Sequence, residues 1–253
     1  MSYFSNIIIF FLIFINFAHA ENLLKIGISD DNSYPYYFKQ AARFQGLEID
    51  LIKEIAHELN LQIQINAFPF KELANELKKN NIDLIISMVS ETPERKAKYA
   101  LSNPYICTYG AFLFRNEKAK LDFSRTNRKN RTPLTIGVYN GTRYHKYAVS
   151  IAENKNLKVQ AFSSHDLAMG AFDAKRLDIV LSEYFLMKDH QSRHRAASFV
   201  MGDNAFVEKL VIMTSKNNQN LIDKINPVLK KMHFDGRLAS LSQKYLKTNL
   251  LCN

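Results

Sequence analysis

The sequence predicts an α/β fold with two parallel sheets, built from two successive blocks of alternating strands and helices. In the first block the apolar run Leu84 to Ile86 is typical of a buried parallel strand, and Thr92-Pro93 then marks a helix start. The second block repeats the alternation after a polar stretch at residues 116–132. Residues 21–253, which follow an N-terminal segment discussed below, are long enough for one large domain or two compact ones.

The spacing of apolar residues locates each element in order. Strands are predicted where apolar residues alternate or form a short continuous run, at 24–28, 61–65, 84–86, 134–138, 159–162 and 178–181. Helices are predicted where apolar residues recur every three or four positions, at 49–59, 73–77, 167–172, 221–232 and 238–245. No internal repeat is visible at the level of residues.

The first twenty residues are expected to be a secretory signal peptide rather than part of the fold. Ile7 to Phe17 is an apolar run of the length found in such peptides, and Ala18-His19-Ala20 is typical of their cleavage site. The run is too short to span a bilayer comfortably, and the charged Glu21 follows at once. We therefore expect a periplasmic protein cleaved after Ala20.

The net charge of +10 does not indicate nucleic-acid binding. Its densest cluster lies in the polar stretch, at Lys118, Lys120, Arg125, Arg128, Lys129 and Arg131. A surface that binds nucleic acid would interleave such cations with aromatic side chains for stacking, and only Phe123 is nearby. A solvated surface loop accounts for the cluster better.

The two cysteines, Cys107 and Cys252, leave one question open. In an oxidising compartment they could pair if the fold returns the end of the chain to its middle. Two unrelated thiols are the simpler interpretation. No C-x-x-C motif or Cys/His cluster is present, so a structural zinc site is not expected.

The segment between the strand at 84–86 and the helix after Thr92 has the composition of an anion site. The carboxyl ends of parallel strands bind ligands in open α/β folds, and here the turn supplies Ser90, helix N–H groups and Arg95. A guanidinium is suited to a carboxylate. The second block offers the turn Gly141-Thr142 and the carboxylate of Glu183. If the two sheets face each other, such a cleft fits a zwitterion, namely an α-amino acid.

Ordered motifs along nearly the whole mature chain resemble the family 3 extracellular solute-binding proteins, the periplasmic polar amino-acid receptors of ABC importers. These motifs are Gly46-Leu47-Glu48-Ile49-Asp50-Leu51, Phe70 to Leu77 with Asp83, Thr92-Pro93-Glu94-Arg95, Ser102-Asn103-Pro104-Tyr105, Gly141-Thr142, Arg176-Leu177-Asp178 with Glu183, and Asp235-Gly236-Arg237-Leu238. The resemblance implies a type II periplasmic-binding fold, in which two α/β lobes are joined by two crossing strands. Lobe 1 would comprise residues 21–110 and 209–253, and lobe 2 residues 111–208. It further implies a monomer whose partners are a small ligand and the membrane subunits of an importer.

The resemblance also implies roles for individual residues. Arg95, Ser90 and Thr142 would hold the ligand's α-carboxylate, and Glu183 would bind its α-ammonium. Phe70 and either Tyr34 or Tyr36 would cover the ligand's side chain. Met88 stands where the family often has Gly or Ser, so thioether packing could replace a polar contact. Asp30 and Asp31 could meet a cationic side chain or simply cap a turn.

Enzyme motifs are not found: the sequence lacks G-x-S-x-G, a Gly-rich phosphate loop and H-E-x-x-H. We expect no catalytic residue, no cofactor and no metal ion. His190 and His194 have the spacing of a metal pair on a helix, but their charged neighbours favour a solvated helix face. Three alternatives stay open: a secreted dehydratase of prephenate or arogenate, which some relatives are, a ligand-sensing module, and a receptor whose ligand is not an amino acid.

Overall fold

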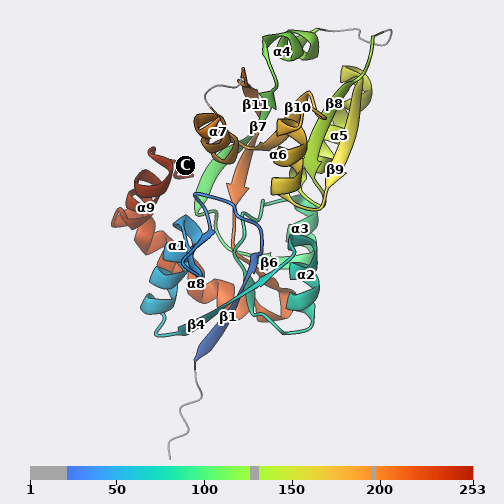
Figure 1. Cartoon of the computed structure of the whole chain (residues 1–253). Coiled ribbons are helices and arrows are strands. Elements are labelled where there is room, and N and C mark those ends of the chain that lie inside the picture. The colour runs from blue at the N-terminus through green and yellow to red at the C-terminus, as the bar shows by residue number, and fades with distance from the viewer. Residues whose placement is uncertain (1–21, 126–130, 195–197, 253) are drawn as a thin grey trace, which may run out of the picture.

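The computed structural model describes residues 22–125, 131–194 and 198–252, which fold into two lobes stacked end to end (Figure 1). Each lobe is built on one five-stranded sheet. The expected signal peptide, residues 1–20, lies outside the described residues. None of the helices in the described ranges combines the length and the apolar composition needed to cross a membrane.

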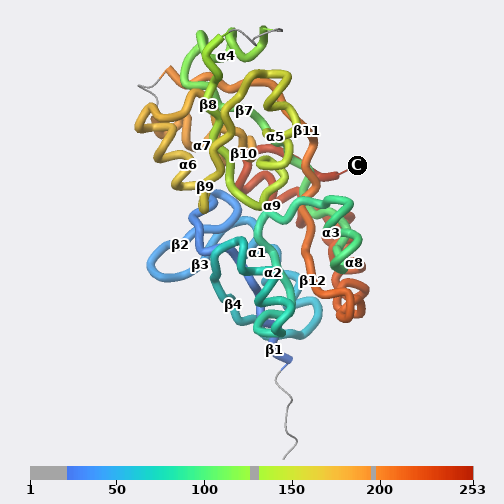
Figure 2. The backbone as a smooth tube through the Cα atoms, turned by 90° about the vertical axis from the view of Figure 1, so that its right-hand side faces the viewer, coloured from blue at the N-terminus to red at the C-terminus, as the bar shows by residue number. Residues whose placement is uncertain are grey.

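The first lobe contains the sheet of strand order β4-β1-β5-β12-β6. The bounds of these strands are Leu23–Ser29 for β1, Gln62–Phe68 for β4, Leu84–Ile85 for β5, Tyr99–Leu101 for β6 and Met213–Ser215 for β12. A short hairpin, β2 and β3 (Phe38–Gln40 and Arg43–Gln45), projects from this lobe (Figure 2). β1 pairs in parallel with β4 and β5, whereas β12 is antiparallel to β5 and β6.

Helices cover both faces of this sheet. Their bounds are Leu47–Glu58 for α1, Phe70–Lys78 for α2, Pro93–Lys98 for α3, Gln219–Phe234 for α8 and Arg237–Leu246 for α9, with a 3-10 turn at Lys216–Asn218 before α8. Leu84 and Ile86 pack with α1, α8 and α9 on one face, and Ile85 packs with α2 on the other. The continuous apolar run at 84–86 therefore reflects a strand that is buried on both sides.

The second lobe contains the sheet of order β11-β7-β10-β8-β9. Its strands are Ile106–Phe114 for β7, Leu134–Tyr139 for β8, Leu157–Phe162 for β9, Ile179–Glu183 for β10 and Val200–Leu210 for β11. Its helices are Glu117–Ser124 for α4, Arg143–Lys155 for α5, His165–Asp173 for α6 and Tyr184–Arg193 for α7. α4 and α5 pack on one face of the sheet, and α6 and α7 on the other.

The expectation of two purely parallel sheets was wrong, because the strands that connect the lobes make both sheets mixed. β7 and β11 run from the first lobe into the second and pair with each other in antiparallel fashion. Because the chain leaves along β7 and returns along β11, each sheet receives antiparallel strands beside its parallel ones. The expected lobe boundaries at 110/111 and 208/209 fall inside these two strands, and the division of the chain at those positions stays a prediction.

The two cysteines form a disulfide bond, so the interpretation as unrelated thiols was wrong. Cys107 on β7 pairs with Cys252, and their Cα atoms lie 5.0 Å apart. The Cys107 N–H also donates to the carbonyl of Leu250, at 2.8 Å. The C-terminal segment therefore returns to the level where the lobes meet (Figure 2).

We expect the double variant Cys107→Ser/Cys252→Ser to fold but to lose about 2–4 kcal/mol of unfolding free energy, because the bond closes a loop across a sequence separation of 145 residues. Thermal melts of both proteins, with and without a reductant, measure this effect. Reductant should lower the wild-type Tm to the value of the variant and leave the variant unchanged. A wild-type Tm that does not respond to reductant would contradict the pairing.

Candidate functional site

A cavity of about 40 Å³, called the inner cavity below, lies between the two lobes and is lined by residues of both. The first lobe contributes Ser33, Tyr37, Phe70, Ser87, Met88, Ser90 and Arg95, and the second contributes Tyr139, Thr142, Tyr144, His165, Ser182 and Leu186. A wider outer cavity of about 330 Å³ adjoins it and shares Phe70, Arg95 and Thr142. The lining of the outer cavity adds the cations Lys71, Lys98, Arg143 and Lys146.

Arg95 is fixed at the boundary of the two cavities by the short helix α3. Thr92 is the N-cap of this helix and its side chain accepts the Arg95 N–H at 3.2 Å, while Pro93 occupies the first helical position. The guanidinium donates to the Ser90 carbonyl at 2.8 Å and lies 5.9 Å from the centre of the Phe70 ring. Burial lowers the pKa of Arg95, and among the described residues its guanidinium forms no ion pair with a carboxylate.

Thr142 stands opposite Arg95, at the start of α5. Its hydroxyl accepts the His145 N–H at 3.4 Å and donates to the Tyr139 carbonyl at 2.6 Å, so it caps the helix. The first N–H groups of a helix have no partner within the helix and carry partial positive charge. Phe70 and Tyr139, one from each lobe, lie 5.6 Å apart between ring centres. Arg95, the α5 N-terminus and this aromatic pair thus surround one space.

Ser90 lines the inner cavity but is already engaged. Its hydroxyl donates to the buried carboxyl group of Glu208 on β11, and the hydroxyl of Tyr144 donates to the other oxygen of the same group. Burial raises the pKa of Glu208. A direct bond from Ser90 to a ligand would therefore compete with Glu208.

Glu183 is fully buried but does not line either cavity. Its carboxyl group accepts hydrogen bonds from Tyr36 at 3.1 Å, from Thr108, and from the Leu186 N–H at 2.9 Å, which makes it the N-cap of α7. Burial raises the pKa of Glu183 to about 8. Because side chains alternate along a strand, Ser182 points into the inner cavity and Glu183 points away from it.

Met88 lines the inner cavity in an unusual backbone conformation. Its φ of +49° lies in the left-handed region, which favours glycine. The Met88 N–H donates to Glu48 at 2.8 Å, and the hydroxyl of Tyr105 donates to the same oxygen. The loop that carries Met88 and Ser90 is therefore held by a buried carboxyl group.

Tyr34 and Asp30 are not brought into the inner cavity. Tyr34 is 45% exposed and lines a separate cavity of about 240 Å³. Tyr36 is buried against Glu183, and the neighbouring Tyr37 lines the inner cavity instead. Asp30 is exposed, whereas Asp31 is half-buried, hydrogen-bonds to Ser29 and lies near the cavity residue Tyr139.

Several cavity residues were not predicted from the sequence. Tyr139 directly follows a predicted strand and lies three positions before Thr142. Its place at the carboxyl end of that strand could have predicted that it lines the cavity. The sequence alone does not show that Tyr144 and Ser182 face the cavity, because this depends on how their helix and strand are oriented in the fold. His165 hydrogen-bonds to Ser182 at 3.2 Å, and burial lowers its pKa to about 4, so its imidazole is neutral at physiological pH.

Comparison with known proteins agrees with this architecture. The family model for bacterial extracellular solute-binding proteins, family 3, matches residues 24–248. An arginine-binding periplasmic protein of Mannheimia haemolytica is 27% identical over 235 residues, which cover 90% of this chain and 92% of that protein. A probable histidine-binding protein of Campylobacter jejuni is also 27% identical, over 91% of this chain and 87% of that protein.

A solved structure shows the same fold. An ancestral arginine-binding protein bound to arginine superposes with a TM-score of 0.79 at 23% identity, over 90% of this chain and 99% of that one. The two lobes, their mixed sheets and the crossing strands β7 and β11 are therefore those of the type II periplasmic-binding fold. The chain belongs to the bacterial extracellular solute-binding proteins of family 3.

Proposed function

We propose that this protein is a periplasmic receptor that captures an amino acid between its lobes and delivers it to an ABC importer, after export and cleavage behind Ala20. The observation that carries the proposal is the half-buried guanidinium of Arg95. It faces a cavity between the lobes and, within the described residues, has no carboxylate partner. Desolvation of the guanidinium is costly, and Glu208 and Glu94 offset only part of that cost, so the carboxylate of a ligand in direct contact would stabilise the cation further.

The carboxylate end of the ligand is proposed to lie between Arg95 and the start of α5. The planar guanidinium can form two parallel bonds with a carboxylate, and the partial positive charge of the α5 N-terminus adds to the attraction. Thr142 lines the same space from the other lobe. The cations of the outer cavity would favour the approach of an anionic group.

The ammonium end is proposed to pair with Glu183, and this pairing requires a rearrangement. The Glu183 carboxyl lies behind Ser182 and accepts a bond from Tyr36. An ammonium ion that displaces the Tyr36 hydroxyl would favour the charged carboxylate. Because this group lies on lobe 2 and Arg95 on lobe 1, a zwitterion would bridge the lobes and stabilise the closed form.

The ligand's side chain is proposed to contact the aromatic rings of Phe70, Tyr37 and Tyr139. Flat aromatic surfaces can stack on a guanidinium or an imidazole. The relatives' names point to arginine and histidine. Asp31 reaches the cavity through Tyr139, so it could attract a cationic side chain where Asp30 cannot.

Arg95→Ala should weaken amino-acid binding by about 3 kcal/mol or more, because the ligand's buried carboxylate loses its charged partner. Arg95→Lys should also weaken it strongly, since a single ammonium cannot form the two parallel bonds. Isothermal calorimetry against a panel that includes arginine and histidine measures both. Lys96→Ala, an exposed position on the same helix, is the matched control and should bind as the wild type does. Near-native affinity in Arg95→Ala would move the site elsewhere.

Binding at pH 7 should release most of one proton from the wild type. The free Glu183 carboxyl, with a pKa of about 8, is protonated at that pH, and the ligand's ammonium would lower this pKa. Affinity should accordingly rise between pH 6 and pH 8. Calorimetry in phosphate and in Tris, which differ in ionisation enthalpy, counts the protons.

Glu183→Gln should abolish this proton release. Glu153→Gln is the control, because Glu153 is an exposed carboxyl group of α5 that lines neither cavity. The control should retain the release. Binding by the wild type without proton release would exclude Glu183 as the partner of the ammonium.

One observation favours a second candidate, the dehydratase. A carboxyl group that keeps its proton at neutral pH can act as a general acid, and Glu183 has this property. Its hydrogen bonds, however, direct it toward Tyr36, Thr108 and the start of α7 rather than into the cavity, so we favour binding without conversion.

Incubation of the mature protein with prephenate or arogenate should therefore give no aromatic product, and a bound amino acid should be recovered unchanged by chromatography. Product formation is followed by its ultraviolet absorbance, with Glu183→Gln measured in parallel. Turnover that disappears in this variant would overturn the receptor assignment and make the cavity an active site.

A further inference from the structure

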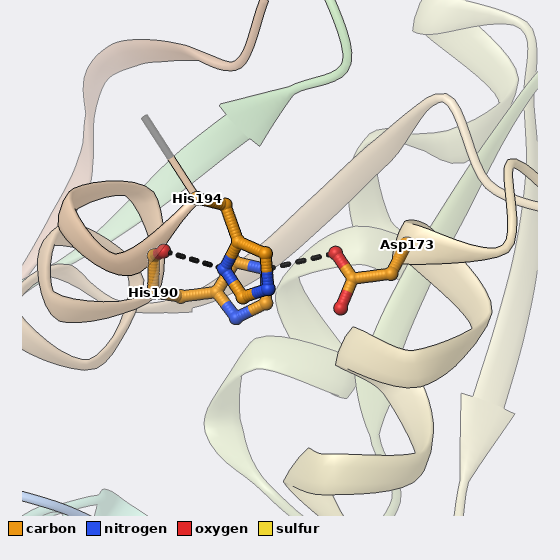
Figure 3. A group of neighbouring side chains, drawn as sticks. All are labelled: Asp173, His190 and His194. Carbon is orange, nitrogen blue, oxygen red and sulfur yellow. Dashed lines mark hydrogen bonds and ion pairs between the residues drawn. The ribbon is translucent and has the colours of Figure 1, made fainter. Parts of the chain in front are cut away.

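Asp173, His190 and His194 form a cluster in the second lobe, away from the residues that line the inner cavity (Figure 3). Asp173 is the last residue of α6, His190 lies on α7, and His194 directly follows the end of α7. One potential metal-ligating atom from each residue can be chosen so that all lie within 4.8 Å of one another. The cluster therefore combines two imidazoles with one carboxylate.

The candidate ligand atoms already lie close to one another. His190 Nε2 lies 2.9 Å from a carboxylate oxygen of Asp173. The two imidazole rings stack with 4.1 Å between their centres and 26° between their planes, and Figure 3 shows both rings turned toward Asp173. In a tetrahedral zinc site with bonds of about 2.0–2.1 Å, neighbouring ligand atoms lie about 3.3 Å apart. Small side-chain rotations would bring the cluster to that spacing.

The surroundings hold these rings as metal sites usually do. His194 Nδ1 lies 2.9 Å from the His190 carbonyl, and a hydrogen bond of this kind leaves the Nε2 lone pair available for a metal. His190 is buried, which corrects the expectation of a solvated helix face, and its ring stacks on Phe199 at 5.9 Å.

The charge of the neighbourhood is compatible with a cation. Arg193 lies close to His190, but its guanidinium is paired with Asp189 on the same helix. The carboxylate of Asp173 would compensate part of the charge of a divalent ion. Imidazole ligands favour zinc, nickel and copper over calcium and magnesium, which prefer oxygen ligands alone.

We propose that Asp173, His190 and His194 bind one divalent first-row transition metal ion, with Zn²⁺ as the representative ion. The three side chains leave at least one coordination position for water. The ion would join the C-terminal ends of α6 and α7 and so stiffen this face of the second lobe. The site shares no residue with the proposed amino-acid clamp of Arg95, Thr142 and Glu183, so the two can be tested separately.

The test uses mature, tag-free protein that has been treated with a chelator and then titrated with Zn²⁺ in a calorimeter. We expect one ion per chain and a Tm that rises on saturation. Titration with Co²⁺ should produce a visible absorption band, since nitrogen and oxygen ligands in a tetrahedral arrangement intensify the d–d transitions. Amino-acid binding should be retained with and without the metal.

His194→Ala and Asp173→Asn, both at exposed positions, should each weaken Zn²⁺ binding at least tenfold and abolish the cobalt band. His233→Ala removes an exposed histidine of α8 in the first lobe and serves as the matched control. It should bind the metal as the wild type does. Unchanged binding in His194→Ala and Asp173→Asn, or no stoichiometric binding by the wild type, would overturn the proposal. Circular dichroism of each variant excludes misfolding as the cause of a loss.

Discussion

The junction of the lobes depends on how buried carboxyl groups are satisfied. A buried carboxyl group is costly unless it is hydrogen-bonded, and here each of three accepts a bond from a buried tyrosine: Glu48 from Tyr105, Glu183 from Tyr36 and Glu208 from Tyr144. Two of these pairs connect the lobes, because Glu183 joins Tyr36 to α7, and Glu208 joins Ser90 to Tyr144. Polar contacts of this kind can exchange for water, unlike the apolar contacts that Phe185 and Leu186 of α7 make with the core of the first lobe.

The same constraint explains the architecture of the site. Glu48 holds the Met88 N–H and thereby fixes the loop that continues to Ser90 and Arg95. Glu208 lies on the returning strand β11, between the two lobes that bound the inner cavity. The residues proposed to bind ligand are thus positioned by groups that ligand does not touch, and changes at Glu48 or Glu208 would alter the cavity indirectly.

Much of this organisation could be predicted from local patterns. The strand at 84–86, the N-cap at Thr92 and the glycine turn before Thr142 have strong sequence signals, and Arg95, Phe70 and Thr142 do line the cavities. What local patterns do not contain is orientation. Ser182 and Glu183 are neighbours on one strand, and only the packing of that strand decides which of them faces the cavity. Tyr37 rather than Tyr34 reaches it for the same reason, and the burial of His190 depends on Phe199, which lies on a separate segment.

The disulfide between Cys107 and Cys252 has a consequence for the covalent chain. Its two ends enclose α4 to α7, the strands β8 to β10 and the whole return path through β11, α8 and α9. A protease that cuts once anywhere in this region would therefore produce two fragments that stay attached to each other through sulfur. Such a nicked protein would run as a single species without reductant and separate only after reduction, so it could keep both lobes together after a cleavage that would otherwise divide them.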